Sequence, residues 1–311
     1  MKPILITCFR NPDLDGFSCA HAYSELLNKS DQDTIAAFWG KPSKEVEFIL
    51  EKYEIAQPKD ADFKDFDEII LVDSAIVSAL PEGLDINKVV ELIDHRKLND
   101  SAKFKNAKAQ IELVGAAATL IAEKFVKANI KPSKESAVLL YGAIVSNTLN
   151  FKSGTTTPRD QKMAEFLAPF VKPDKKFAKE MFRAKSDLAD HTLKEILEND
   201  YVSYDIFGKE IGIAQLEIVE GKRLAKERKD EILSELKYLN DKYKADLSFC
   251  SIISLDENCN IFIANDERSK KLLETMLKVK FDNHLVIRNG FIMRKEFGHL
   301  WPKFEKFIKA L

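Results

Sequence analysis

The stretch Ile4–Gly16, ILITCFRNPDLDG, contains a short apolar run that leads into an acidic loop. Its first residues predict a buried β-strand, and the residues from Gly16 onward predict a helix. The loop between them carries Asp13 and Asp15. A phosphate-binding loop at this position would be rich in glycine, because backbone amides must approach the anion. The acidic loop therefore either caps the helix or holds a cation.

Two further predicted strands end in groups of the same kind. EIILV (Glu68–Val72) is followed by Asp73, and VVELI (Val89–Ile93) is followed by Asp94 and His95. Ligands of open α/β sheets bind at the carboxyl ends of the strands. A single aspartate there is more often a helix cap, but three such strand ends favour a cation site. Oxygen ligands with one imidazole suit Mn²⁺ or Mg²⁺.

Strand and helix patterns alternate through the N-terminal half, which is typical of an α/β domain with a parallel sheet covered on both faces. The expected helices are Gly16–Lys29, Val114–Ala128 and Lys134–Leu149. A polar, lysine-rich segment at Val171–Thr192 indicates the domain boundary. We expect a parallel-sheet α/β domain over residues 1–185 and a smaller α+β domain over residues 192–311.

The C-terminal half mixes strand and helix patterns. Two strands are expected in Tyr201–Val219, around a turn at Gly208-Lys209, and one long charged helix from about Gly221 to Lys244. Two more strands and a helix follow. The segment HLVIRNGFIMRK, His284–Lys295, predicts a final hairpin.

Composition excludes several classes of protein. The chain has 311 residues, a hydrophobic fraction of 45% and a formal net charge of -2, which argues against binding to long nucleic acids. We find no apolar run of about 20 residues, the length of a membrane span, and no signal-peptide pattern. The four cysteines lack the spacing of a zinc site, so free thiols in a reducing cytoplasm are expected.

Four motifs carry a resemblance to a known family. NPDLDG, LVDSA, LIDHR and SNTLNFKSGTT resemble, in order and spacing, those of the DHH phosphoesterase superfamily. The C-terminal half is similar to the DHHA2 domain of the branch that contains manganese-dependent (family II) inorganic pyrophosphatases, exopolyphosphatases and prune-type proteins. The resemblance covers nearly the whole chain, and it implies an active site in the cleft between the two domains.

The resemblance implies a metal centre for Mn²⁺ (or Mg²⁺) in which one aspartate, Asp73, is shared by two ions. The expected ligands are, in chain order, Asp13, Asp15, Asp73, His95 and Asn147. Two metals close together acidify a bridging water and neutralise phosphate charge. The resemblance therefore implies hydrolysis of a phosphoanhydride, with catalytic roles for Asp73, Asp94, His95 and Arg96.

The motifs of this chain depart from those of the pyrophosphatases at three positions. Phe9 stands where a histidine ligand is expected, and Asn147 stands where an acid is expected. Arg96 replaces the second histidine of the DHH triplet, as in prune-type proteins, and would offer phosphate a cationic fork. Asp94 is expected to orient His95 through the far nitrogen of its ring. The departures predict weaker metal binding.

Further residues are expected to contact the substrate. Arg294 and Lys295 stand where the pyrophosphatases carry a basic clamp, and His191 stands at the position of a substrate lysine. Lys152 lies in FKSGTTTPRD, where a phosphate contact and a plain turn before a helix, capped by Thr157 or Asp160, remain open.

Three functions remain open from the sequence. The first is metal-dependent hydrolysis of pyrophosphate or polyphosphate, which the second domain and its basic pair favour. The others are hydrolysis of nucleotides or very short oligonucleotides, and a degenerate protein that binds phosphorylated ligands without turnover. A small phosphate substrate is the expected partner; a homodimer is left open, and no membrane is expected.

Overall fold

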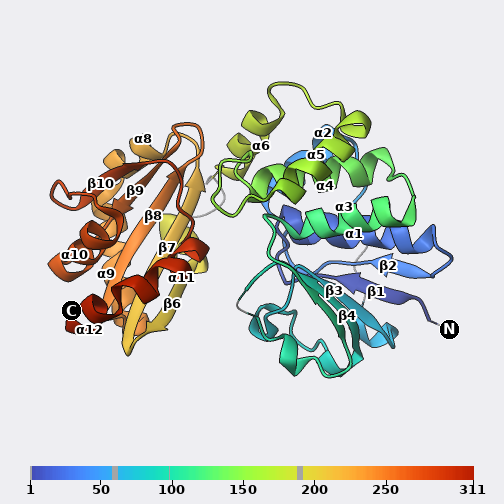
Figure 1. The fold of residues 1–311 in the computed structure, drawn as a ribbon, viewed down its shortest axis with the longest axis horizontal. Coiled ribbons are helices and arrows are strands. Elements are labelled where there is room, and N and C mark those ends of the chain that lie inside the picture. The colour runs from blue at the N-terminus through green and yellow to red at the C-terminus, as the bar shows by residue number, and fades with distance from the viewer. Residues whose placement is uncertain (1, 58–61, 98, 188–191) are drawn as a thin grey trace. The chain divides into compact units, whose positions relative to one another are not determined.

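The computed structural model describes residues 2–57, 62–97, 99–187 and 192–311 (Figure 1). The chain divides into two compact units, Met1–Ala184 and Lys185–Leu311. Among the helices of the described residues, none combines the length and the apolar character that crossing a membrane requires.

The first unit contains a five-stranded sheet in which every neighbouring pair of strands is parallel. In spatial order its strands are β2 (Thr34–Ala36), β1 (Ile4–Thr7), β3 (Ile69–Val72), β4 (Val89–Asp94) and β5 (Lys108–Ile111). The central strand β3 is buried at every position, as its continuous apolar run predicts for a parallel sheet. The predicted α/β fold is confirmed. The sequence did not reveal the two edge strands, because they are short and carry few buried apolar residues.

The helices of this unit lie on one side of its sheet. They are α1 (Leu14–Asn28), α2 (Lys44–Lys52), α3 (Ala117–Ala128), α4 (Lys134–Asn147), α5 (Pro158–Val171) and α6 (Phe177–Lys185). Figure 1 shows α1 and α3 against the sheet, and α4 packs on α1. The other face is covered by short three-ten turns, whose side chains Phe63, Val77 and Ile86 pack on the strand residues Leu71 and Leu92. The carboxyl ends of β1, β3 and β4 remain available for a site.

The second unit is a smaller α+β fold, as predicted. Its sheet has the order β10 (Leu285–Asn289), β9 (Cys259–Ile263), β8 (Leu247–Ser254), β7 (Lys209–Ile218) and β6 (Tyr201–Ile206). Only β7 and β8 run parallel among these neighbours. The helices are α7 (Leu193–Asn199), α8 (Gly221–Glu227), α9 (Lys229–Tyr243), α10 (Glu267–Leu277), α11 (Phe297–Leu300) and α12 (Glu305–Ala310).

Two predicted elements of this unit are wrong. The chain after β10 forms no second strand of a hairpin: the side chain of Asn260 bonds the backbone of Ile292, accepting from its amide at 2.9 Å and donating to its carbonyl at 2.8 Å. Those backbone groups are the ones that a further strand would need. The predicted long helix is broken at Arg228 into α8 and α9. The break falls in the charged run 226–230, which offers no apolar side chain to bury.

Candidate metal site

The acidic loop after β1 combines the two roles that the sequence left open. Asp13 is the N-cap of α1, and its Oδ1 accepts a hydrogen bond from the Gly16 amide at 2.9 Å. Asp15, in the first turn, is 1% exposed and points into the unit. One carboxylate therefore caps the helix, and the other is left for a buried site.

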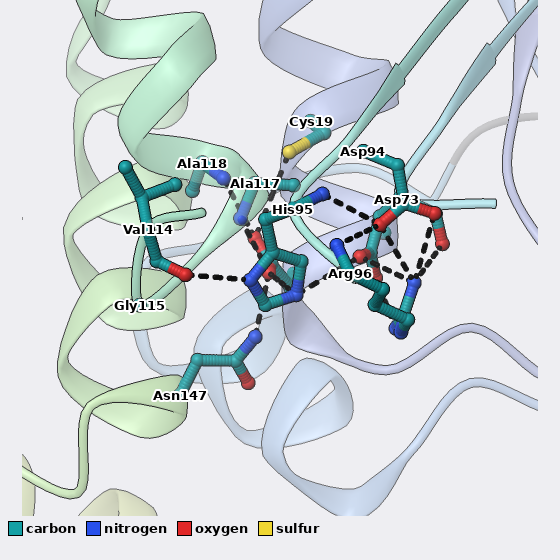
Figure 2. Close-up of polar contacts among 12 residues, drawn as sticks. Cys19, Asp73, Asp94, His95, Arg96, Val114, Gly115, Ala117, Ala118 and Asn147 are labelled. Atoms are coloured by element: carbon teal, nitrogen blue, oxygen red, sulfur yellow. Dashed lines mark hydrogen bonds and ion pairs between the residues drawn. The ribbon is translucent and has the colours of Figure 1, made fainter. Parts of the chain in front are cut away.

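Asp15 is held by the start of α3. Its Oδ2 accepts from the Ala117 amide and its Oδ1 from the Ala118 amide, both at 2.8 Å (Figure 2). The N-cap of α3 is Ala116, whose side chain cannot satisfy the amides of the first turn, so Asp15 does so from another helix. Sequence reasoning assigned no role to these amides. The available signal was a predicted helix that begins without Ser, Thr, Asp or Asn.

Asp73 follows β3 in an unusual backbone conformation. Its φ is 52°, in the left-handed region, which costs a residue other than glycine about 1–2 kcal/mol. Its amide donates to the Ile93 carbonyl at 2.7 Å, which ties the bend to β4. The side chain is fully buried. The strained bend therefore directs a carboxylate into the interior beside the next strand end.

His95 follows β4 and faces both carboxylates. Its Nδ1 lies 2.9 Å from the Val114 carbonyl oxygen, and because a carbonyl only accepts, Nδ1 carries the hydrogen. In the neutral ring Nε2 then holds a lone pair. It lies 3.5 Å from Asp73 Oδ1 and 3.8 Å from Asp15 Oδ2 (Figure 2), longer than good hydrogen bonds. Three electron-rich groups therefore converge on one buried point.

The role expected for Asp94 is corrected. The far nitrogen of His95 is oriented by Val114, not by Asp94. Asp94 instead accepts from three backbone amides, those of Ala75 at 2.7 Å, His95 at 2.6 Å and Arg96 at 3.0 Å. Asp94 thus fixes the two loops after β3 and β4. A carboxylate directly before a histidine cannot bend back to its ring while it holds the histidine's own amide.

The electrostatics of Asp15, Asp73 and His95 favour a cation. Their ligand atoms all lie within 4.8 Å of one another, and all three residues are buried. Burial raises the pKa of Asp15 well above its usual value, and the charges of Asp73 and Asp13 raise it further; the two α3 amides oppose the shift. A divalent ion would remove this repulsion, so the residues present fit the implied metal.

Asn147, the last residue of α4, approaches the same point. Its Nδ2 donates to Asp15 Oδ2 at 2.6 Å. In this orientation the amide nitrogen faces the cluster, and the amide must turn before its oxygen can ligate an ion. Leu149, Asn150 and Phe151 follow with φ of 52°, 53° and 64°. Three successive left-handed residues store backbone strain close to the site.

Arg96 also contacts Asp73. Its Nη1 lies 2.9 Å from Asp73 Oδ1 and donates to the Asp73 carbonyl at 2.8 Å. Asp94 accepts from the same nitrogen at 3.3 Å. The guanidinium carbon lies 5.9 Å from the centre of the Phe9 ring, within the range of a cation–π contact. Phe9, which stands where a histidine ligand is expected, therefore lies beside the guanidinium of Arg96.

The other expected site residues belong to other segments of the chain. Lys152 is exposed in the turn between α4 and α5, and Thr157 caps α5 in a capping box with Asp160, as one reading of that segment predicted. Arg294 binds the Asp200 side chain at 2.8 Å, within the second unit. Lys295 is exposed. His191 lies outside the described residues.

A parallel sheet whose strand ends deliver Asp15, Asp73 and the Asp94-His95 pair defines a DHH-type phosphoesterase domain. The DHH family, N-terminal domain, matches residues 3–144, and the DHHA2 domain matches residues 179–297. The chain belongs to the DHH family, in the branch with a DHHA2 domain that includes the manganese-dependent inorganic pyrophosphatases.

Individual relatives are similar over almost their whole length. A probable manganese-dependent inorganic pyrophosphatase of Clostridium acetobutylicum is 32% identical over 94% of each chain. A manganese-dependent inorganic pyrophosphatase of Methanothrix thermoacetophila is 30% identical over 94% of this chain and 95% of its own. The crystal structure of a putative family II inorganic pyrophosphatase of Methanococcus jannaschii matches with a TM-score of 0.75 and 27% identity, over 94% of this chain and 96% of the other.

Proposed function

We propose that this protein hydrolyses phosphoanhydride bonds with the help of Mn²⁺ or Mg²⁺, acting on inorganic pyrophosphate or on polyphosphate. The observation that carries the proposal is the position of His95 Nε2, whose lone pair faces two buried carboxylates at 3.5 and 3.8 Å. A divalent ion at this point would be in reach of all three groups. The names of the relatives, manganese-dependent inorganic pyrophosphatases, support the choice of metal and substrate.

In this proposal Asp15, Asp73 and His95 hold the ion, and the amide of Asn147 turns its oxygen toward it. Asp13 stays the helix cap and adds negative charge at the edge of the site. A bound divalent ion supplies positive charge for the phosphoryl oxygens and acidifies water. The α3 amides and the Val114 carbonyl keep the ligands in position, so little reorganisation is needed when the ion binds.

The residues that contact the substrate are a further part of the proposal. Arg96 is one third exposed at its side chain, so the edge of the guanidinium that Asp73 and Asp94 leave uncovered can bind a phosphoryl oxygen. Arg294 and Lys295 would grip the distal phosphate from the second unit, with smaller contributions from Lys152 and His191. The first unit would thus be the catalytic domain and the second the substrate-binding domain.

Two observations favour a second candidate function, the binding of phosphorylated ligands without turnover. Phe9 cannot ligate a metal, and Asn147 presents its amide nitrogen to Asp15. Both features weaken the metal centre that hydrolysis requires.

The cellular setting completes the proposal. A cytoplasmic location is supported by the four cysteines, all of which are free and buried. A homodimer stays a prediction, which sedimentation equilibrium would test.

The experiment that tests the proposed function is phosphate release with and without Mn²⁺. The substrates are pyrophosphate, tripolyphosphate, long polyphosphate and a cyclic nucleotide. We expect Mn²⁺-dependent release from the first three. Release from the cyclic nucleotide alone would favour a phosphodiesterase, and no release from any substrate, with binding retained, would favour the second candidate.

A further inference from the structure

We propose that the guanidinium of Arg96 takes the place of a second metal ion, so that the site binds a single divalent cation. The inference deepens the proposed function and rests on the metal site described there. It starts from Asp73, the carboxylate that contacts both His95 and Arg96.

Asp73 has two neighbours that bear nitrogen donors or ligands. His95 Nε2 lies 3.5 Å from Oδ1, and with Asp15 it encloses the point that suits a divalent ion. Arg96 Nη1 lies 2.9 Å from the same oxygen, and Nη2 donates to Oδ2 at 3.3 Å. A second ion that used Asp73 would have to compete with the guanidinium, which contacts both carboxylate oxygens.

The guanidinium is held in place by more than this ion pair. Nη1 also donates to the Asp73 carbonyl at 2.8 Å and to Asp94 at 3.3 Å. The ring of Phe9 lies beside it, 5.9 Å from centre to guanidinium carbon. A planar cation that binds carboxylates through several donors and contacts an aromatic ring is what arginine provides and lysine does not.

Charge balance supports the same reading. Three fully buried carboxylates, Asp15, Asp73 and Asp94, face this centre. One guanidinium and one divalent ion neutralise three negative charges, with a neutral His95. A second divalent ion would place further positive charge beside Arg96, which the half-buried Asp13 of the same loop could offset only in part. A buried charge without compensation is strongly destabilising.

Phe9 and Arg96 therefore act as one unit. A histidine at position 9 would be a donor that competes with Arg96 for the same space and charge. With phenylalanine there, the guanidinium has an apolar, electron-rich surface on one side and carboxylates on the other. The positive charge that a second ion would supply during phosphoanhydride cleavage is carried by the chain itself, permanently and without exchange with the solvent.

The test is metal stoichiometry, measured by equilibrium dialysis with elemental analysis and by the Mn²⁺ EPR spectrum. The variants are Phe9→His, Arg96→Met and the two combined, with Arg223→Met as a matched surface control, since Arg223 is 67% exposed. We expect about one ion in the wild type, with the spectrum of an isolated ion. Phe9→His alone should stay at about one, because Arg96 still covers Asp73. The combined variant should bind about two, with a coupled spectrum.

Two results would overturn the inference. One is a second ion in the wild type or in Phe9→His alone, which would mean that Arg96 does not exclude it. The other is a folded combined variant that still binds only one ion. If that variant does not fold, the wild type and Phe9→His decide. These readouts are independent of turnover: a wild type that binds one ion and releases no phosphate from any substrate refutes the proposed function and supports the inference.

Discussion

The two units differ in how they hold their candidate functional groups. In the first unit, Asp15 and His95 are each fixed by backbone groups of another element, the α3 amides and the Val114 carbonyl. In the second unit, Arg294 is fixed by an acid of its own unit, Asp200. The candidate metal ligands thus bring buried carboxylates together, whose charge a divalent ion would offset, whereas the basic residue of the second unit is paired with one acid.

This difference teaches which functional residues can be inferred with physical support. Buried carboxylates that lie beside one another create a demand for a cation, because burial and their mutual charge both disfavour the ionised forms. An ion pair makes no such demand, because Asp200 balances Arg294 whether or not a phosphate arrives. Experiments can test this difference in either unit, by removing a carboxylate of the first unit or the basic charge of the second.

The largest effect is expected from Asp73→Asn, which removes the shared charge. Asparagine tolerates the left-handed backbone of this position, so the fold should survive. Loss of a direct ligand should weaken Mn²⁺ binding by more than about a hundredfold, the upper range for indirect partners of a metal, with turnover reduced accordingly. Isothermal titration with Mn²⁺ measures the change. Retained affinity would show that the ion binds elsewhere.

A smaller effect is expected from Asn147→Asp, which should lower the stability of the metal-free protein and raise its affinity for Mn²⁺. In the metal-free protein the new carboxylate would lie against Asp15, where the amide now donates at 2.6 Å, so the melting temperature should fall. With Mn²⁺ the added charge should tighten binding about tenfold, or about 1.4 kcal/mol. Thermal denaturation with and without Mn²⁺ checks both signs. A variant that is more stable without metal would contradict this account of the cluster.

The repulsion also predicts a pH dependence. Because the pKa of Asp15 is raised in the metal-free fold, its carboxyl holds, at pH values below that raised pKa, a proton that Mn²⁺ must displace. Affinity should fall as pH drops through that raised pKa, by up to about tenfold per unit. The metal-free fold should lose stability as pH rises from about 3.9, the ordinary aspartate value, toward the raised one. Titrations in buffers of different ionisation enthalpy measure the released proton; binding without proton release below the raised pKa would contradict it.

The smallest effects are expected from the basic pair of the second unit. Lys295→Met should raise the KM for pyrophosphate several-fold with an unchanged melting temperature, since an exposed lysine contributes little to stability. Arg294→Met should also cost about 1 kcal/mol of folding free energy, because it breaks the bonds to Asp200. The surface variant Lys309→Met is the matched control. An unchanged KM in both variants would remove the pair from the substrate site.

The sequence predicted the candidate metal ligands better than the backbone groups that hold them in position. Strand ends can be predicted because apolar runs mark the strands, and a parallel topology brings the carboxyl ends of the strands together. The amides that hold Asp15 and the carbonyl that orients His95 are backbone groups, which carry no residue signature. The bonds from Asn260 to Ile292 that replace the expected hairpin are likewise tertiary contacts that no local pattern encodes.

The role of Arg96 illustrates the remaining limit. The sequence predicted that Arg96 binds phosphate, because its position in the motif indicated no contact with Asp73. The structure adds the contacts to Asp73, Asp94 and the Phe9 ring. These depend on the bend at Asp73, whose positive φ no sequence pattern announces.

The central claim, that Asp15, Asp73 and His95 together bind a divalent ion, is tested most directly by anomalous diffraction from crystals soaked in Mn²⁺. The account predicts one strong peak in contact with all three side chains, with the Asn147 amide turned so that its oxygen faces the ion. A site without a peak at saturating Mn²⁺, or a peak that avoids His95, would contradict it.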